Sequence, residues 1–339
     1  MSSPTSFRSP APRPSIVHLP AAGWSGSLLD FLVERFPKVP RETWRQRFER
    51  GEVQGAQGEK LDPAQPGSPH LELRYFREVA LAEEPDFGPP VIVFANAELV
   101  VADKPPFQPV TPSGPWVRSC LLYQVAAALA AEGEETAELV PLHRLDRATS
   151  GLVLMSRRAA TRSLYGRLFE ERKVAKVYEA LAELPALPEP RSWTVKSRLV
   201  AGEPFFRMRE TLGEPNAESE IELVETWEQE GRHLGRFELR PSTGKKHQLR
   251  IHMASLGFPI LGDRYYPELQ PEAADDPAKP LCLLARQLAF RDPVDGNNRL
   301  FTSRFAWAFC HAVSSSALAP GDRSRPRPAA RECENGRGV

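Results

Sequence analysis

Residues 141–151 form the densest group of polar side chains within an otherwise apolar stretch of the chain. They read Pro-Leu-His-Arg-Leu-Asp-Arg-Ala-Thr-Ser-Gly and run directly into the apolar residues 152–155. Asp146 lies between Arg144 and Arg147, and neighbouring cations favour the ionised carboxylate that a nucleophile or a general base requires. A turn with a surface ion pair has the same sequence. The segment is therefore a candidate catalytic loop, with a structural turn as the alternative.

A second polar segment, residues 240–252, places Lys245 and Lys246 at the start of an expected helix, with His247 beside them. The positive end of the helix dipole lies there, so two lysines are unfavourable unless an anion binds. A phosphate held at the helix N-terminus meets that need, and a solvated basic turn is the alternative. His247 and His252 are five positions apart, which does not give the same-face pair of a helical metal site.

Two smaller features accompany these segments. Alternation in the expected strand 174–181 puts Lys176 and Tyr178 on one face, where a tyrosine beside a cation could stack on a flat base. A core tyrosine is the commoner case. Residues 103–105, Asp-Lys-Pro, follow an apolar run and by themselves predict a turn that ends a strand.

Composition limits the classes of function. The 339 residues include 44 Lys and Arg and 44 Asp and Glu, so any surface for a nucleic acid must be local. Hydrophobic residues make up 41% of the chain, and no apolar run approaches the roughly 18 residues of a membrane span, so we expect a protein that does not contact membranes. The N-terminus lacks the apolar stretch of a signal peptide, which favours the cytoplasm. The 4 cysteines are widely spaced and predict neither a zinc cluster nor disulfides.

Proline, at 34 of 339 residues, marks the expected joints between parts of the chain. Its distribution predicts a disordered leader at 1–20 and a disordered tail at 313–339. Between them we expect a small module of two helices followed by strands at 24–77, a linker at 78–90 and a large domain at 91–312.

Periodicity in the apolar residues indicates elements of both kinds. We expect helices at 28–36, 41–50, 119–132, 161–172 and 248–256, the last ended by Gly257. We expect strands at 91–94, 99–102, 151–155, 176–181, 220–225 and 235–240. The sum is a mixed α+β domain, too irregular for a doubly wound parallel sheet.

Taken in order, the motifs resemble those of the RluA-type pseudouridine synthases, which are RNA uridine isomerases. His143 to Leu152 matches the family's H-R-L-D-R-x-T-S-G-L run without a gap. Asp103-Lys104-Pro105 matches its D/N-K-P element, and Lys176-Val177-Tyr178 its K-x-Y strand. The segments 240–250 and 260–266 match the closing R-P-x-T-G-x-x-H-Q-[IL]-R and G-D-x-x-Y block.

This resemblance implies both a fold and a set of roles. The fold would be a mixed, mostly antiparallel sheet with flanking helices and an active cleft across its middle. Asp146 would be the catalytic aspartate, Tyr178 the aromatic residue that packs against the target base, and Arg250 the cation that pairs with Asp146. Arg144 would enter the RNA stack as the uridine is flipped out. No metal and no cofactor would be needed.

The expected partner is structured RNA, ribosomal or transfer, bound by a monomer. Arg144, Arg147, Lys245, Lys246 and His247 are the predicted RNA-binding residues. The 24–77 module resembles in outline the small RNA-binding unit that precedes many such domains, and its second helix is basic.

Two alternatives remain. One is a non-catalytic RNA-binding protein on the same scaffold, which an acidic residue at the centre of a basic cleft disfavours. The other is a glycoside or nucleoside hydrolase that uses Asp146 and Asp263 as a carboxylate pair and would release free base or sugar.

Overall fold

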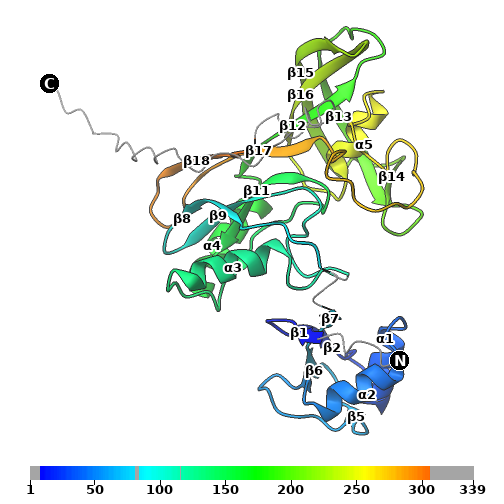
Figure 1. Cartoon of the computed structure of the whole chain (residues 1–339), viewed down its shortest axis with the longest axis vertical. Helices are drawn as coiled ribbons and strands as arrows, with labels where there is room; N and C mark the ends of the chain where they lie inside the picture. Colours follow the sequence, from blue (N-terminus) through cyan, green and yellow to red (C-terminus); the bar gives the residue numbers. More distant parts are fainter. Residues whose placement is uncertain (1–7, 81–83, 115, 306–339) are drawn as a thin grey trace, which may run out of the picture.

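The computed structural model describes residues 8–80, 84–114 and 116–305 (Figure 1). Its large body contains the strands β8 (Val91–Ala95), β9 (Leu99–Lys104), β10 (Val140–Pro141), β11 (Ser150–Ser156), β12 (Ala175–Glu183), β13 (Ser192–Ala201), β14 (Met208–Thr211), β15 (Ala217–Gln229), β16 (Arg232–Pro241), β17 (Leu283–Arg291) and β18 (Asn298–Thr302). The helices α3 (Leu121–Ala131), α4 (Ala159–Glu170) and α5 (Gln248–Ser255) accompany them.

These strands form one 11-stranded sheet in the order β14-β13-β15-β16-β12-β17-β11-β9-β8, with β10 beside β11 and β18 beside β17. Among its described pairs, β11 and β17 run parallel and the others antiparallel. The predicted mixed, mostly antiparallel sheet with flanking helices is confirmed. The sequence analysis did not identify β13, β14, β17 or β18.

Helices α3 and α4 cover opposite faces of β9 and β11. Val100 of β9 and Val153 of β11 pack in one cluster with the apolar face of α3, whereas Leu99 and Leu152 pack in another with α4. Successive side chains on a strand point to opposite faces, so a strand buried on both faces is a continuous apolar run. The expected buried strands at 99–102 and 151–155 are confirmed. Val91 to Phe94 also form a strand, but at the sheet edge and only half-buried.

Helix α5 packs its apolar face against β16 and β17. Leu249 and Met253 are buried in a cluster with Phe237 of β16 and Leu283 of β17. The helix ends at Ser255, and Gly257 has a φ of +85°, a conformation that favours glycine at a helix end. This packing fixes the orientation of the residues that begin the helix.

The N-terminal body contains β1 (Arg8–Pro10), β2 (Ser15–His18), β3 (Trp24–Ser27), α1 (Leu28–Arg35), α2 (Arg41–Glu49), β4 (Val53–Gln54), β5 (Pro66–Gly67), β6 (Glu72–Tyr75) and β7 (Glu78–Ala80). Both expected helices are present, and they enclose a core with Leu32, Trp44 and Leu73 at its centre. Ser27 caps α1 in a reciprocal capping box with Asp30.

Strand pairing corrects the predicted leader and linker. Strand β2 pairs with β6, and β1 pairs with β7, so the segments 8–20 and 78–80 contribute to folded sheets. Composition misled here because the prolines obscured a short apolar pattern, in which Val17 and Leu19 join the N-terminal core. Residues 1–7 and 313–339 lie outside the described residues. The boundaries of the 24–77 module and the 91–312 domain stay predictions.

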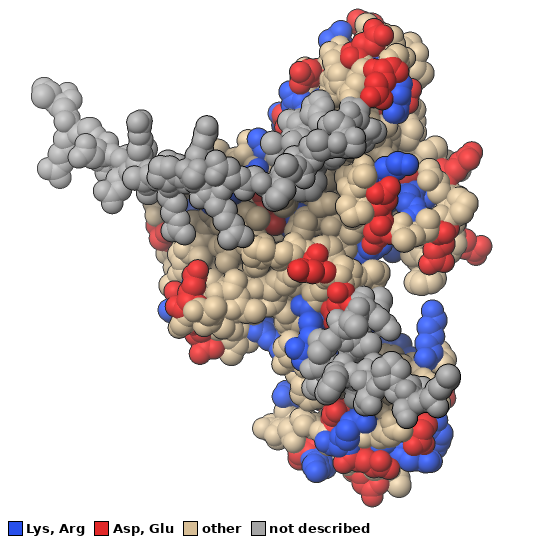
Figure 2. Space-filling view, viewed as in Figure 1, with Lys and Arg blue, Asp and Glu red and all other residues tan. Residues whose placement is uncertain are grey.

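The arginines of α2 are neutralised within the N-terminal body. Arg41 pairs with Asp30 at 2.7 Å, and Arg45 with Glu42 at 3.2 Å. Arg47 is buried, with its guanidinium 4.8 Å from the centroid of the Trp44 ring. Figure 2 shows both charge signs interspersed over this body. Its second helix is therefore a weaker candidate for phosphate binding than its arginine content predicts.

Gly151 lies where the candidate catalytic loop enters β11, and its substitution tests the close approach of β11 to β17. Its φ is +109°, and an added Cβ would lie 2.6 Å from the backbone nitrogen of Ala285 in the parallel neighbour β17. Gly133 has a similar φ of +81° with nothing within 4 Å, so it serves as a matched control. We expect Gly151→Ala to lower the free energy of unfolding by about 2–4 kcal/mol, because it adds a backbone clash to the positive-φ strain.

Gly133→Ala should lower the free energy of unfolding by only about 1 kcal/mol, because this variant adds positive-φ strain without a backbone clash. Denaturant unfolding of both variants measures the two losses. Equal losses would contradict the close approach of β11 and β17.

Candidate active site

The loop between β10 and β11 carries Asp146 into a pocket of about 320 Å³. Leu145 is buried in the α3 cluster, and the backbone N–H of Thr149 donates to the Asp146 carbonyl at 3.1 Å. Seven of the eight predicted site residues line this pocket or lie directly beneath Asp146: Arg144, Asp146, Tyr178, Lys245, Lys246, His247 and Arg250. The structure therefore brings together three segments that are remote in sequence.

Asp146 is partly buried, with 20% of its side chain exposed. Burial raises the pKa of its carboxyl group, and nearby cations, with Arg250 first and then Arg144, Lys246 and Lys104, oppose that rise. The sequence analysis expected Arg144 and Arg147 to favour the ionised form. Arg144 does favour the ionised form, but Arg250 lowers the pKa of the Asp146 carboxyl more than Arg144 does. The charged form is thus held at a desolvation cost by cations from several elements.

Arg250 makes its shortest ion pair with Asp263 rather than with Asp146. Its Nε and Nη2 donate to the two Asp263 oxygens at 2.7 and 2.6 Å, while its Nη1 lies 3.9 Å from Asp146 Oδ2. Asp263 also accepts from the backbone N–H of Tyr265 at 2.8 Å and of Tyr266 at 3.2 Å. The predicted Arg250–Asp146 pair is therefore a looser contact, because a buried partner on the 260–266 turn already orients the guanidinium.

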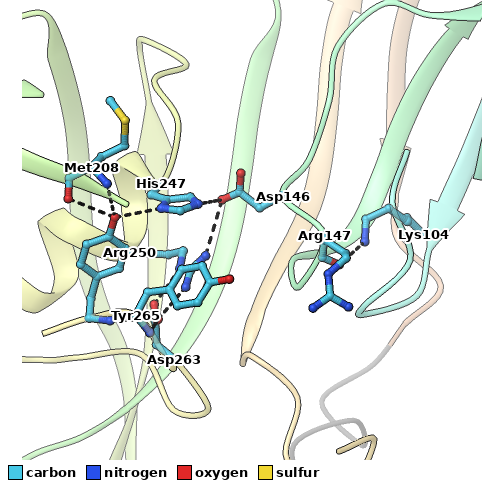
Figure 3. Close-up of polar contacts among 9 residues, drawn as sticks. Lys104, Asp146, Arg147, Met208, His247, Arg250, Asp263 and Tyr265 are labelled. Atoms are coloured by element: carbon cyan, nitrogen blue, oxygen red, sulfur yellow. Dashed lines mark hydrogen bonds and ion pairs between the residues drawn. The ribbon is translucent and has the colours of Figure 1, made fainter. Parts of the chain in front are cut away.

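His247 lies beneath Asp146 rather than on the RNA-facing surface that the sequence analysis assigned to it. Its ring is buried, with Nδ1 2.8 Å from the Tyr266 hydroxyl and Nε2 3.8 Å from Asp146 Oδ2 (Figure 3). Burial, together with Arg250 and Lys246, lowers the pKa of His247 to about 3, so the imidazole is neutral near pH 7. The single proton of the Tyr266 hydroxyl is shared between two acceptors, Nδ1 and the Met208 carbonyl at 3.2 Å; when Nδ1 accepts it, the proton on Nε2 faces the carboxylate.

Tyr178 and Lys176 share the pocket, as the strand alternation predicts. Burial and the charge of Asp146 raise the pKa of the Tyr178 phenol, so it stays protonated. Lys176 donates to the Thr243 carbonyl at 3.1 Å, which connects β12 to the segment before α5. The aromatic ring and the carboxylate thus border the same space.

Lys245 and Lys246 are exposed at the mouth of the pocket, just before the first turn of α5. Gln248 orders this segment, because its side-chain oxygen accepts from the Lys245 N–H at 3.0 Å and from the Thr243 hydroxyl at 2.8 Å. His247 has a φ of +57° and gives α5 no side-chain cap. Two free ammonium groups and an uncapped helix start are compatible with the predicted anion site.

Arg147 is the predicted site residue that the structure separates from the others. Its guanidinium pairs with Asp275 and lies 4.6 Å from the centroid of the Trp116 ring, and it does not line the pocket. Figure 3 shows the side chain directed away from Asp146. Its backbone carbonyl accepts from Lys104. RNA contact by Arg147 stays a prediction that this geometry does not support.

The sequence analysis assigned no role to Lys104, Tyr265 or Tyr266, although it quoted all three within motifs. Lys104 is fully buried, and its ammonium donates to the carbonyls of Pro105, Gln108 and Arg147 at 2.8 to 3.0 Å. Burial lowers its pKa to about 7. An apolar run that ends in lysine was the available signal, since a lysine inside a sheet must find buried acceptors.

The described residues contain no cluster of three or more His, Cys, Asp or Glu side chains that could hold a metal. Within the same residues, none of the helices is both long enough and apolar enough to cross a membrane.

Comparisons with known proteins identify the family of this chain. A family model for RNA pseudouridylate synthase matches residues 98–255. An uncharacterised RNA pseudouridine synthase of Synechocystis sp. is 31% identical over 252 residues, covering 70% of this chain and 79% of the relative. The dual-specificity RNA pseudouridine synthase RluA of Escherichia coli is 36% identical over 163 residues, covering 47% of this chain and 70% of RluA.

Among solved structures, human RNA pseudouridylate synthase domain containing 4 matches with a TM-score of 0.51 and 23% identity. It covers 66% of this chain and 91% of the human one, and it supports the fold. The family model and the sequence relatives define an isomerase that acts on RNA. The chain belongs to the RluA-type RNA pseudouridine synthase family and converts uridine in RNA to pseudouridine.

Desolvation of Asp146 should make Asp146→Asn more stable than the parent at neutral pH. The folded-state pKa is raised above the unfolded value of about 3.9, so the folded protein binds the extra proton and loses stability as pH rises through this interval. Asparagine carries no charge and avoids that loss. We expect a higher melting temperature for Asp146→Asn at pH 7 and a difference that shrinks as the pH falls toward about 4.

Thermal melting across this pH range measures the effect, with Asp86→Asn as the control at an exposed carboxylate. If the parent is more stable than Asp146→Asn at pH 7, the attraction between Asp146 and the nearby cations exceeds the free-energy cost of desolvating its carboxylate, and the prediction is wrong.

Proposed function

We propose that the enzyme isomerises specific uridines of ribosomal or transfer RNA with Asp146 as the catalytic carboxylate. The observation that carries this proposal is the composition of the pocket. Asp146 is the one carboxylate among the described residues that line it, and its neighbours include Arg144, Lys245, Lys246 and Arg250. A desolvated carboxylate surrounded by cations is suited to act on a ribose whose phosphates those cations hold.

Isomerisation requires the uracil to leave the ribose, to turn and to rejoin through its carbon 5, which then loses its proton. Attack by Asp146 on the anomeric carbon and removal of a ribose proton by Asp146 both need the ionised carboxylate. Among the neighbouring cations, Arg250 does most to oppose the rise in the pKa of the Asp146 carboxyl, and Asp263 holds its guanidinium in place. The neutral His247 orients the carboxylate from beneath without competing for its charge.

The target base must leave its helix to reach this pocket. Tyr178 borders Asp146, and its ring offers an apolar face for the flipped uracil. Arg144 is exposed at the rim, where its guanidinium can occupy the space that the uridine vacates. Lys245 and Lys246 bind the phosphates beside the target. The reaction draws on protein side chains alone, and we propose that a cytoplasmic monomer carries it out without a metal or a cofactor.

Both alternatives lose support from the geometry. A non-catalytic RNA-binding protein gains nothing from a desolvated Asp146, which repels phosphate. A hydrolase with Asp146 and Asp263 needs a second carboxyl group able to exchange protons with substrate. Asp263 is buried and committed to Arg250 and to two backbone N–H groups.

Replacement of the carboxylate tests the proposal. We expect Asp146→Asn to lower the rate of isomerisation by at least about a thousandfold while RNA affinity stays within about a few-fold, because the change removes charge and almost no volume. Release of tritium from RNA labelled at uridine carbon 5 measures turnover on ribosomal and transfer RNA transcripts. Asp86→Asn should keep the parent rate. Turnover by Asp146→Asn near that of the parent, or release of free uracil by the parent, would overturn the assignment.

The two exposed lysines provide a test of phosphate binding. Lys245→Gln with Lys246→Gln should weaken binding to every RNA and reduce the slope of log affinity against log salt by about one unit for each lost phosphate contact. Arg232→Gln is a suitable control, because Arg232 lies at the opposite end of β16 and pairs with Glu183. Filter binding at several salt concentrations gives the slopes. An unchanged slope would mean that the two lysines do not contact phosphates and belong to a solvated basic turn.

A further inference from the structure

The loop between β13 and β14 presents aromatic residues to solvent beside the active site. Phe205 is 84% exposed, an unusual state for a phenylalanine, and Phe206 next to it is half-buried. Figure 1 shows β14 next to α5, the helix that carries Arg250. Neither phenylalanine belongs to the family motifs in the sequence, and the reaction proposed above uses neither.

These rings continue without a break toward the catalytic carboxylate. The centroids of Phe205 and Phe206 are 5.6 Å apart, and those of Phe206 and Tyr265 are 5.2 Å apart. The Tyr265 ring lies 4.8 Å from the Arg250 guanidinium carbon. Figure 3 shows Tyr265 beside Arg250, below Asp146. A row of three aromatic rings therefore leads from solvent to the edge of the pocket.

The loop that carries the phenylalanines is held in place. The Arg207 backbone N–H donates to the Pro204 carbonyl at 2.8 Å, and Gly202 donates to the Arg207 carbonyl at 3.1 Å. Beyond the loop, the Met208 N–H donates to the Tyr266 hydroxyl at 2.8 Å. The backbone that carries Phe205 is thus anchored next to Tyr266.

We propose that Phe205, Phe206 and Tyr265 form a stacking platform for an unpaired base of the substrate RNA next to the target uridine. Flipping the target breaks the stack on both of its sides, so a neighbouring base needs a new surface. Aromatic side chains provide one for any base, since every base has a π face. Arg209, exposed on β14, adds a cation for the backbone of the same strand. The proposal rests on the RNA isomerase activity and extends it to the recognition of flanking nucleotides.

Removal of the exposed ring is the direct test. We expect Phe205→Ala to weaken binding of an active RNA transcript by about tenfold or more, and Phe205→Trp to keep the parent affinity, because stacking needs a ring rather than a phenylalanine. Leu300→Ala is the matched control, an apolar side chain 65% exposed on the remote strand β18. Melting temperatures of all three variants should equal that of the parent, since neither side chain is buried.

A fluorescent base analogue separates stacking from other contacts. Transcripts with 2-aminopurine next to the target should lose fluorescence on binding the parent and Phe205→Trp, and lose much less on binding Phe205→Ala. The platform is wrong if Phe205→Ala binds and quenches like the parent while the parent releases tritium. It is also wrong if Phe205→Ala alters the oligomeric state, which would make the ring a protein contact. Absence of tritium release from the parent would count against the isomerase assignment instead.

Discussion

Arg250 and Asp263 form a two-pronged ion pair from which solvent is almost excluded, with 4% and 1% of their side chains exposed. Breaking such a pair is strongly unfavourable because it leaves a buried charge without a partner. The pair fixes the guanidinium beside Asp146 and the 260–266 turn beside α5. It also leaves Asp146 with a cation whose other bonds are satisfied. Asp146 can then keep its charge without holding Arg250 in place.

The pocket is assembled from parts of the sheet that meet around β17. The loop before β11 brings Asp146, and Gly151 at its end lies against the backbone of Ala285 in the parallel strand β17. On the other side of β17, β12 brings Tyr178 and pairs with β16, which leads to Lys245 and α5. Strand β17 separates these two halves. The position of Asp146 relative to Lys245 and α5 therefore depends on the pairing of β17 with β11 on one side and with β12 on the other.

Much of this organisation could be predicted from local signals. Buried strands such as β9 and β11 are continuous apolar runs and could be recognised from the sequence alone. That Asp146, Tyr178 and Lys245 share one pocket followed only from the resemblance to the family, because their segments are remote in sequence. The ion-pair partners of individual arginines could not be predicted in the same way. Arg147 pairs with Asp275, and Arg250 pairs more closely with Asp263 than with Asp146, and sequence spacing alone could not identify these partners. Strands β13 and β14 were not identified because their exposed faces carry polar and charged residues that weaken the apolar pattern.

The hydroxyl of Tyr266 contacts both the start of β14, next to the Phe205 loop, and the His247 ring near Asp146. It accepts from the Met208 N–H at the start of β14 and lies 2.8 Å from Nδ1 of His247, whose other ring nitrogen faces Asp146. The loop that bears Phe205 and the imidazole beneath the carboxylate are therefore tied to one atom. An enzyme that must hold a flipped uridine and its neighbour at once needs a constant spacing between the two positions. A buried hydroxyl shared by both supports maintains that spacing more strictly than separate side chains would, because neither support can shift without giving up a hydrogen bond in a desolvated setting.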